Sequence, residues 1–89
     1  MEQIQLSGEF DLSRKDELRH LLAHVDGNCP VVLDVRGVTY GDSSFLSELG
    51  QLRARHPDCE MIIRGASPMM LKIFRLIKFN KLFTIDGCD

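Results

Sequence analysis

A nearly unbroken apolar run, "VVLDV" at residues 31–35, constrains the fold of this chain more than any other stretch. Three valines and one leucine within five residues suit a strand that is covered on both faces, and Pro30 fits the entry of such a strand. A strand of this kind lies inside a sheet, with other strands on either side. The sequence therefore predicts a layered α/β fold built around this segment.

Shorter apolar runs supply further strands, and amphipathic segments with helical period separate them. The predicted strands are residues 4–6, 31–35, 60–64 and 82–85, and the predicted helices begin at residues 13, 43 and 67. Short connections between alternating strands and helices favour parallel strands joined by right-handed crossovers. We expect one small α/β domain over residues 1–89, with a short, mostly parallel central sheet and three to four helices.

Local signals mark the ends of the predicted helices. Ser13, with Asp16 three residues later, resembles a capping box, and "GN" at residues 27–28 is typical of a helix stop. Ser67 followed by Pro68 predicts the N-cap and the first position of the third helix. The second helix is expected to run from about Ser43 to Arg55, because "HPD" follows it.

Charge and hydropathy exclude several classes of function. The formal net charge of −2 supplies no attraction to nucleic acid or to anionic lipid, so direct nucleic-acid binding is not expected. No apolar run approaches the roughly 20 residues of a membrane span, and the N-terminus lacks the basic flank and apolar stretch of a signal peptide. We expect a cytoplasmic protein that does not insert into a membrane.

Cysteine and histidine do not indicate a metal site. Cys29, Cys59 and Cys88 are odd in number and widely spaced, without a C-x-x-C pair, so the sequence predicts reduced thiols and neither a disulfide framework nor a zinc site. His20 and His24 stand at i and i+4, yet no third ligand is spaced to join them. No metal and no cofactor is expected.

The strand-to-helix loops of a parallel sheet all emerge at its carboxyl edge, where such folds build their sites. Here these loops are "GEFDLS", "RGVTYGDSS" and "RGASP". They are predicted to place on one rim the residues Glu9, Asp11, Asp42, Ser43, Ser44 and Ser67. The loops contain no His or Cys to activate a serine, and no G-x-x-x-x-G-K-[ST] phosphate cradle is present. The rim therefore predicts binding rather than catalysis.

The stretch "DSS" at residues 42–44 has two interpretations from the residues alone. An Asp or Ser at a helix start accepts a hydrogen bond from a free N–H, and one such residue is enough. A hydroxyl beside a helix N-terminus is also a suitable phosphorylation site, where about two added negative charges would lie beside Asp42. Both interpretations stay open on these grounds.

Three longer motifs together resemble the STAS domain, the family of bacterial anti-sigma factor antagonists and of the cytoplasmic tails of sulfate transporters. The motif "LSGEFDLSRKDELRHLL" is similar to the family's L-x-G-E-x-D and first helix. "VVLDVRGVTYGDSSFL" is similar to its strand, D-S-[ST]-G-L element and second helix. "GASPMMLKIFRLIKFNKLFTI" resembles its closing helix, so the resemblance runs from about residue 4 to residue 85.

The resemblance implies a role for each rim residue. By position, the family's phosphorylated serine is Ser43, and Asp11 belongs to the partner-binding face. The candidate partner contacts are Glu9, Asp11, Asp42, Ser44, Phe45 and Ser67. In this family the unphosphorylated antagonist binds an anti-sigma factor serine kinase and frees a sigma factor, and phosphorylation reverses the binding. The implied protein is not an enzyme.

Two departures from the family pattern affect the site and the sheet. Phe45 replaces the family's glycine: its spacing with Leu49 and Leu52 predicts a core position, which we favour, whereas the family position predicts an exposed rim site. Only seven residues precede Gly8, so most of the family's preceding strand is missing. Residues 4–6 are then expected near an open sheet edge, which favours a homodimer or pairing with a partner strand.

A second function from the same family stays open. Small stand-alone STAS proteins serve as subunits of lipid-transport ABC systems, where they dock on the ATPase, and they need no serine after the aspartate. Ser43 favours the signalling role over this one. Basic residues at helical spacing in the last third of the chain suit either an acidic partner or an ordinary solvated face: Lys72, Arg75, Lys78 and Lys81.

Overall fold

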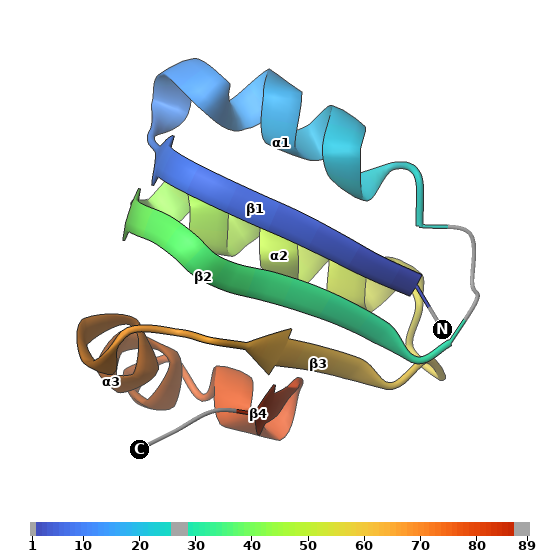
Figure 1. Cartoon of the computed structure of the whole chain (residues 1–89). Helices are drawn as coiled ribbons and strands as arrows, with labels where there is room; N and C mark the ends of the chain where they lie inside the picture. The colour runs from blue at the N-terminus through green and yellow to red at the C-terminus, as the bar shows by residue number, and fades with distance from the viewer. Residues whose placement is uncertain (1, 26–28, 87–89) are drawn as a thin grey trace.

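The computed structural model describes residues 2–25 and 29–86, and four parallel strands form its single sheet (Figure 1). The strands are β1 (Glu2–Phe10), β2 (Val31–Gly41), β3 (Met61–Arg64) and β4 (Thr84–Asp86), and they lie in sequence order across the sheet. The "VVLDV" run is part of β2, which has a strand on each side. The predicted parallel α/β fold is confirmed.

Three α-helices alternate with these strands: α1 (Lys15–Leu22), α2 (Ser43–Arg55) and α3 (Pro68–Leu76). Two short 3₁₀ turns, η1 (Leu12–Arg14) and η2 (Phe79–Lys81), precede α1 and follow α3. The predicted bounds of α2 and the predicted cap of α3 at Ser67 are confirmed. The predicted cap at Ser13 is wrong, because Asp11 caps η1 there and accepts a hydrogen bond from the Ser13 N–H. The predicted stop at residues 27–28 lies outside the described residues.

β1 and β2 are longer than predicted. β1 spans residues 2–10 rather than 4–6, and β2 continues through residues 36–41, which were predicted as a loop. The two strands pair along nearly their whole length, with register shifts between Gln5 and Ser7 and between Gly8 and Glu9. These irregularities interrupt the alternation of apolar and polar residues, which is why the sequence pattern did not show the strands continuing.

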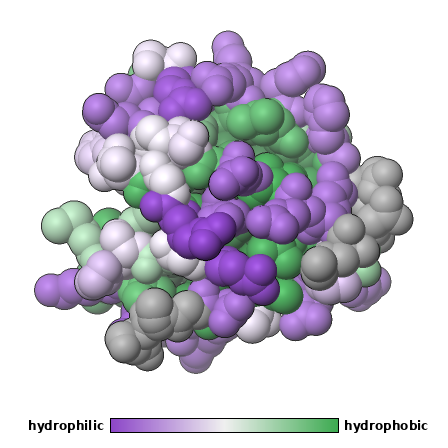
Figure 2. Space-filling model, in the orientation of Figure 1, coloured by the Kyte–Doolittle hydropathy of each residue, from purple (hydrophilic) through white to green (hydrophobic). Residues whose placement is uncertain are grey.

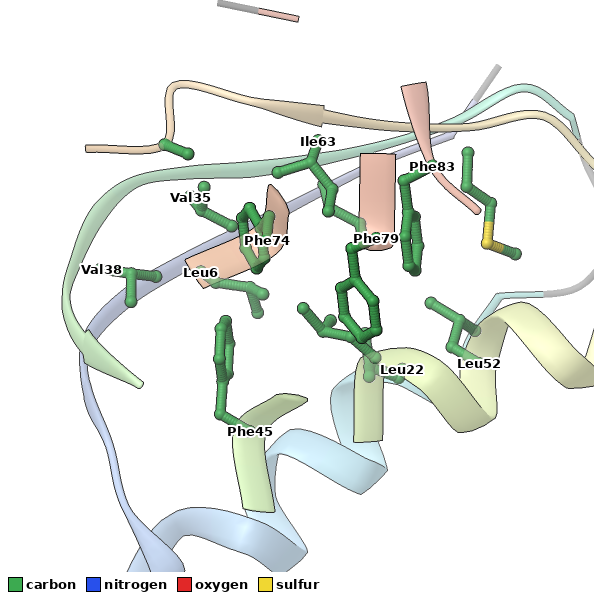
Figure 3. Close-up of a cluster of buried hydrophobic side chains, with 14 of the residues drawn as sticks. Leu6, Leu22, Val35, Val38, Phe45, Leu52, Ile63, Phe74, Phe79 and Phe83 are labelled. Carbon is green, nitrogen blue, oxygen red and sulfur yellow. The ribbon is translucent and has the colours of Figure 1, made fainter. Parts of the chain in front are cut away.

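The hydrophobic core lies on one face of the sheet and contains residues from all three α-helices. Figure 3 shows side chains from strands and helices converging there, among them Leu6, Val35, Ile63, Leu22, Phe45, Leu52 and Phe74. In a sheet whose strands follow sequence order, crossovers of one hand bring every helix to the same face.

Polar side chains lie over the opposite face of the sheet, with apolar surface between them (Figure 2). Figure 2 shows hydrophilic side chains lying across the middle of this face. Asp34 of β2 is only 1% exposed there, and its carboxylate accepts hydrogen bonds from the Arg36 side chain, with Arg36 Nη2 at 2.9 Å. These hydrogen bonds, followed by one from the Arg36 backbone N–H, lower the pKa of Asp34 despite its burial. The first five residues of β2 are thus buried on both faces, as predicted. The helices cover one face, and side chains of the sheet itself cover the other.

The prediction of reduced cysteines is wrong for two of the three. Cys29 and Cys59 form a disulfide, with their Cα atoms 5.4 Å apart. Each stands two residues before a strand, and β2 and β3 pair with Val31 opposite Met61, so the sheet register itself brings the two cysteines together. Cys88 lies outside the described residues.

Neither a membrane-spanning helix nor a metal-binding group of side chains is found among the described residues. None of their helices combines the length and the apolar character that crossing a membrane requires. Within residues 2–25 and 29–86, no three His, Cys, Asp or Glu side chains are grouped so that they could hold a metal ion. The ring of His24 instead lies 3.0 Å from the backbone oxygen of His20, measured from Nδ1.

Candidate partner-binding rim

At the carboxyl edge of the sheet, a backbone hydrogen bond connects the first two strand-to-helix loops. Asp42 follows β2 and donates its backbone N–H to the carbonyl oxygen of Phe10, the last residue of β1, at 3.2 Å. The N–H of Leu12 also contributes to the low pKa of the Asp42 carboxyl by hydrogen bonding. Asp42 therefore connects the loop after β1 to the start of α2. We call this edge the rim, as predicted from the topology.

The Asp42 carboxylate is the N-cap of α2. Its Oδ1 accepts hydrogen bonds from the Ser44 hydroxyl at 2.6 Å, from the Ser44 N–H at 2.9 Å and from the Phe45 N–H at 3.2 Å. The Ser44 hydroxyl is the main cause of a pKa below the usual range of an aspartate, with the backbone N–H groups adding to it. Asp42 is therefore an ionised group held in one position.

Asp11 repeats this arrangement on the neighbouring loop. Its Oδ1 accepts hydrogen bonds from both the backbone N–H and the hydroxyl of Ser13, two residues later. The sequence D-x-S thus forms the same cap twice, at residues 11–13 and 42–44. The result is a rim with two carboxylates in fixed orientations.

The two adjacent serines have different roles in the structure. Ser44 is half-buried and its hydroxyl is held by Asp42. Ser43 is exposed at the first position of α2, and within the described part of the chain no hydrogen-bond partner engages its hydroxyl. The Ser43 hydroxyl is therefore accessible from solvent without the loss of a hydrogen bond between described residues.

Phe45 is a core residue, as its helical spacing predicted. Its side chain is 1% exposed, and its ring stacks on Phe10 with centroids 5.3 Å apart. A Cβ atom at Gly41 would lie 2.5 Å from the Phe45 ring, so the absence of a side chain at Gly41 makes room for it. Because the ring is buried, we correct the assignment of Phe45 as a partner contact.

Glu9 and Ser67 lie at the ends of the rim. Both are exposed, and the Ser67 hydroxyl oxygen accepts a hydrogen bond from the Met70 N–H at 3.2 Å as the cap of α3. No hydrogen bond or ion pair between described residues joins either side chain to Ser43. Ser67 follows β3, and β3 is the strand next to β2, so topology alone places it on the same edge as Asp42.

Sequence reasoning missed three apolar residues of the rim. Leu12, Tyr40 and Met69 are 69%, 51% and 74% exposed; Leu12 follows Asp11, Tyr40 is the last residue but one of β2, and Met69 lies two residues after Ser67. For Leu12 and Tyr40 the available signal was a large apolar side chain in a predicted strand-to-helix loop, whereas Met69 lies within the third helix and carried no such signal. They give the rim an apolar component next to its carboxylates.

The fold and the rim define a small parallel α/β domain with a candidate binding edge. Comparisons with known proteins identify its family. A family model described as "Mlab, STAS domain" matches residues 2–84, and the chain therefore belongs to the STAS domain family. The anti-sigma factor antagonist SpoIIAA, in its unphosphorylated form, has a similar structure, with a TM-score of 0.62 and 23% sequence identity. The alignment covers 83% of this chain and 72% of that one, and it shows a shared fold. No curated protein matches significantly.

Proposed function

We propose that this STAS domain is a non-catalytic protein-binding module, acting in the cytoplasm, whose rim is switched by phosphorylation of Ser43. The observation that carries the proposal is the exposed, unengaged hydroxyl of Ser43 at the start of α2, directly beside the ionised Asp42. Unphosphorylated, the rim presents Leu12, Tyr40 and Met69 to a partner, together with carboxylates at Glu9 and Asp11.

Phosphate at Ser43 would act through electrostatics. A helix N-terminus normally stabilises an added phosphate, but here the Asp42 carboxylate already accepts the N–H groups of Ser44 and Phe45. The phosphate must then displace Asp42 or add about two negative charges next to it. Either outcome disfavours a partner surface that is apolar or acidic. A coupling of about 30- to 150-fold in partner affinity is enough for a useful switch.

Phe45 does not prevent this mechanism. The family's glycine at this position leaves the rim open, and a larger residue there would obstruct a partner if it were exposed. In this chain the ring lies inward against Phe10, and Gly41 provides the space. The burial of Phe45 supports access of a kinase and of a partner to Ser43.

The partner that fits best is an anti-sigma factor serine kinase. Its unphosphorylated antagonist would bind it and free a sigma factor, and the kinase would reverse the binding by phosphorylating Ser43. The fold shared with SpoIIAA, an anti-sigma factor antagonist described in its unphosphorylated form, supports this choice.

A second candidate is a subunit of a lipid-transport ABC system that docks on the ATPase. The observation that favours it is the matching family model, which carries the name Mlab rather than that of an antagonist. This role would use a binding surface but no phosphorylated serine. The two candidates therefore differ in whether Ser43 has to accept phosphate.

The test is to incubate the chain with ATP and candidate anti-sigma kinases from the same genome and to locate phosphate by mass spectrometry. We expect phosphate on Ser43, none in the Ser43→Ala variant, and normal labelling of Ser43 in Ser44→Ala. Ser43→Asp should weaken kinase binding by at least tenfold. If Ser43 stays unlabelled and Ser43→Asp binds like the wild type, the switch is ruled out. Co-purification with an ABC ATPase that persists in Ser43→Asp would support the second candidate.

A further inference from the structure

A second exposed surface lies at the end of α3 that is farther from the rim. There the chain leaves α3 at Leu76 and turns into η2, which ends at Lys81. Leu76, Ile77 and Leu82 are 73%, 42% and 47% exposed. Together with three exposed lysines they form a surface that we call the apex, made of Lys72, Leu76, Ile77, Lys78, Lys81 and Leu82.

The part of the apex that follows α3, residues 78–82, is a turn held by backbone hydrogen bonds. The N–H of Lys81 donates to the carbonyl oxygen of Lys78 at 3.1 Å, and the N–H of Leu82 donates to that of Phe79 at 3.0 Å. Phe79 is buried beneath the turn and packs between Phe74 and Phe83, with ring centroids 5.8 and 5.3 Å away. The exposed leucine, isoleucine and lysine side chains are therefore presented by an anchored segment.

The charge of the apex is opposite to that of the whole chain. Three of the eleven Lys and Arg residues, Lys72, Lys78 and Lys81, belong to the apex, and Glu60 lines the same hollow as Lys81 and Leu82. The net charge of −2 argued against attraction to anionic lipid, but this argument does not apply to a surface with its own positive charge.

The arrangement of lysines among apolar residues selects the kind of partner. Protein interfaces are depleted of lysine at their centre and are anchored by Trp, Tyr or Arg, whereas the apex alternates Lys with Leu and Ile. At a membrane surface the same mixture is favourable, because lysine stems lie along apolar surface while their ammonium groups reach lipid phosphates.

We propose that the apex is a peripheral membrane-binding site, which docks on anionic bilayers with Leu76, Ile77 and Leu82 entering the headgroup region and the lysines pairing with lipid phosphates. The proposal uses residues that the rim does not use. It can therefore hold whether or not Ser43 is phosphorylated, and its failure would not affect the rim.

Co-sedimentation of the purified chain with lipid vesicles tests the proposal. We expect binding to vesicles of equal parts phosphatidylglycerol and phosphatidylcholine, little binding to pure phosphatidylcholine, and loss of binding when salt is raised from about 0.1 M to about 1 M. Each of the substitutions Lys72→Gln, Lys78→Asn and Lys81→Gln should weaken binding about fivefold. Asparagine is chosen for Lys78 because the backbone there has a φ of 66°, which Asn tolerates.

A fluorescent probe separates docking from unfolding. The chain contains no tryptophan, so Leu76→Trp introduces a single reporter at the apex, and Leu12→Trp places a matched reporter on the rim. Anionic vesicles should shift the emission of the first variant to the blue and leave the second unchanged. Wild-type protein that stays in the supernatant with anionic vesicles overturns the proposal. Binding that survives all three lysine substitutions together, or an equal shift of both reporters, also overturns it.

Discussion

The rings of Phe10 and Phe45 stack with their centroids 5.3 Å apart and an interplanar angle of 25°, directly beneath the two rim loops that carry Asp11 and Asp42. This pair joins the end of β1 to the first turn of α2 through the core, and the Asp42 N–H to Phe10 carbonyl bond joins them through the backbone. The position of Ser43 is therefore set by packing as well as by capping.

Truncation of this pair should destabilise the fold. Phe45→Ala is expected to lower the free energy of unfolding by about 3–5 kcal/mol, because it removes a buried ring and leaves a cavity. Gly41→Ala should cost about 1–3 kcal/mol, since its Cβ would lie 2.5 Å from the Phe45 ring. Urea unfolding measures both.

Gly50→Ala is the matched control for the Gly41 substitution. Gly50 lies within α2, and a Cβ there would meet only Phe79, at an ordinary 3.8 Å. Alanine should therefore stabilise the chain by about 0.5–1 kcal/mol through its helix propensity. A loss of stability at Gly50 similar to that at Gly41 would contradict the role assigned to the Phe45 ring.

The pKa of the Asp42 carboxyl should report the difference between the two serines. The hydrogen bond from the Ser44 hydroxyl is the main cause of its low pKa, so Ser44→Ala should raise the pKa toward the usual value and Ser43→Ala should leave it unchanged. NMR titration of the carboxyl carbon measures both. Equal shifts in the two variants would show that Ser43 also holds Asp42.

The same low pKa predicts the pH dependence of stability. A carboxyl whose pKa is lower in the folded chain stabilises it above the unfolded pKa of about 4, and that stabilisation is lost as the pH falls through the lower, folded value. Asp42→Asn should therefore reduce the fall in melting temperature below about pH 4. An unchanged acid profile in this variant would show that Asp42 is not among the groups responsible.

Arg14 should limit pairing through the open edge of the sheet. Its guanidinium donates from Nη1 to the carbonyl oxygens of Ser7 and Glu9 on β1, at 2.9 and 3.2 Å, and a side chain at Gly8 would clash with it. These bonds occupy groups that an additional strand would need. A homodimer through β1 is therefore proposed only for its first residues, and Arg14→Ala should increase self-association in sedimentation velocity experiments.

Glu17→Ala is the control for this edge. It removes the ion pair of Arg14 with Glu17, whose Nη2 to Oε2 distance is 2.7 Å, but leaves the bonds to β1 possible. Self-association should stay at the wild-type level. If both variants associate equally, the ion pair rather than the occupied carbonyls explains the effect.

Arg36 should stabilise the chain by keeping the buried Asp34 ionised and paired. Arg36→Gln is expected to destabilise the chain at neutral pH, because it removes the guanidinium that pairs with a carboxylate only 1% exposed. Asp34→Asn in the same background should restore part of the loss. Arg64→Gln breaks an exposed pair with Asp86 and removes a charge that contributes less than Arg36 to the low pKa of Asp34, so it should cost less than Arg36→Gln. Thermal unfolding of the wild type, the two single variants Arg36→Gln and Asp34→Asn, their double variant and Arg64→Gln forms the test, and an additive double variant would contradict the coupling.

The sequence predicted the parallel sheet, the central position of β2 and the bounds of α2, because apolar periodicity and caps are local signals. It placed Phe45 in the core by the same reasoning. It missed the length of β1 and β2, since their irregular pairing depends on contacts between the two strands. The Cys29–Cys59 disulfide and the Asp34–Arg36 pair were also missed. The disulfide depends on strand register. The ion pair depends on which face of the sheet the helices leave uncovered, and among the described residues no helix covers the face that carries Asp34.

The helix α3 begins beside the rim and ends at the apex, so one rigid element separates the two proposed binding surfaces. Its nine residues give this helix a length of about 14 Å. A protein partner held near a bilayer could then contact the rim while the apex rests on lipid, and the second contact would form at a high effective concentration. Phosphate at Ser43 would in that case change the residence time of the chain at the membrane without altering its affinity for lipid.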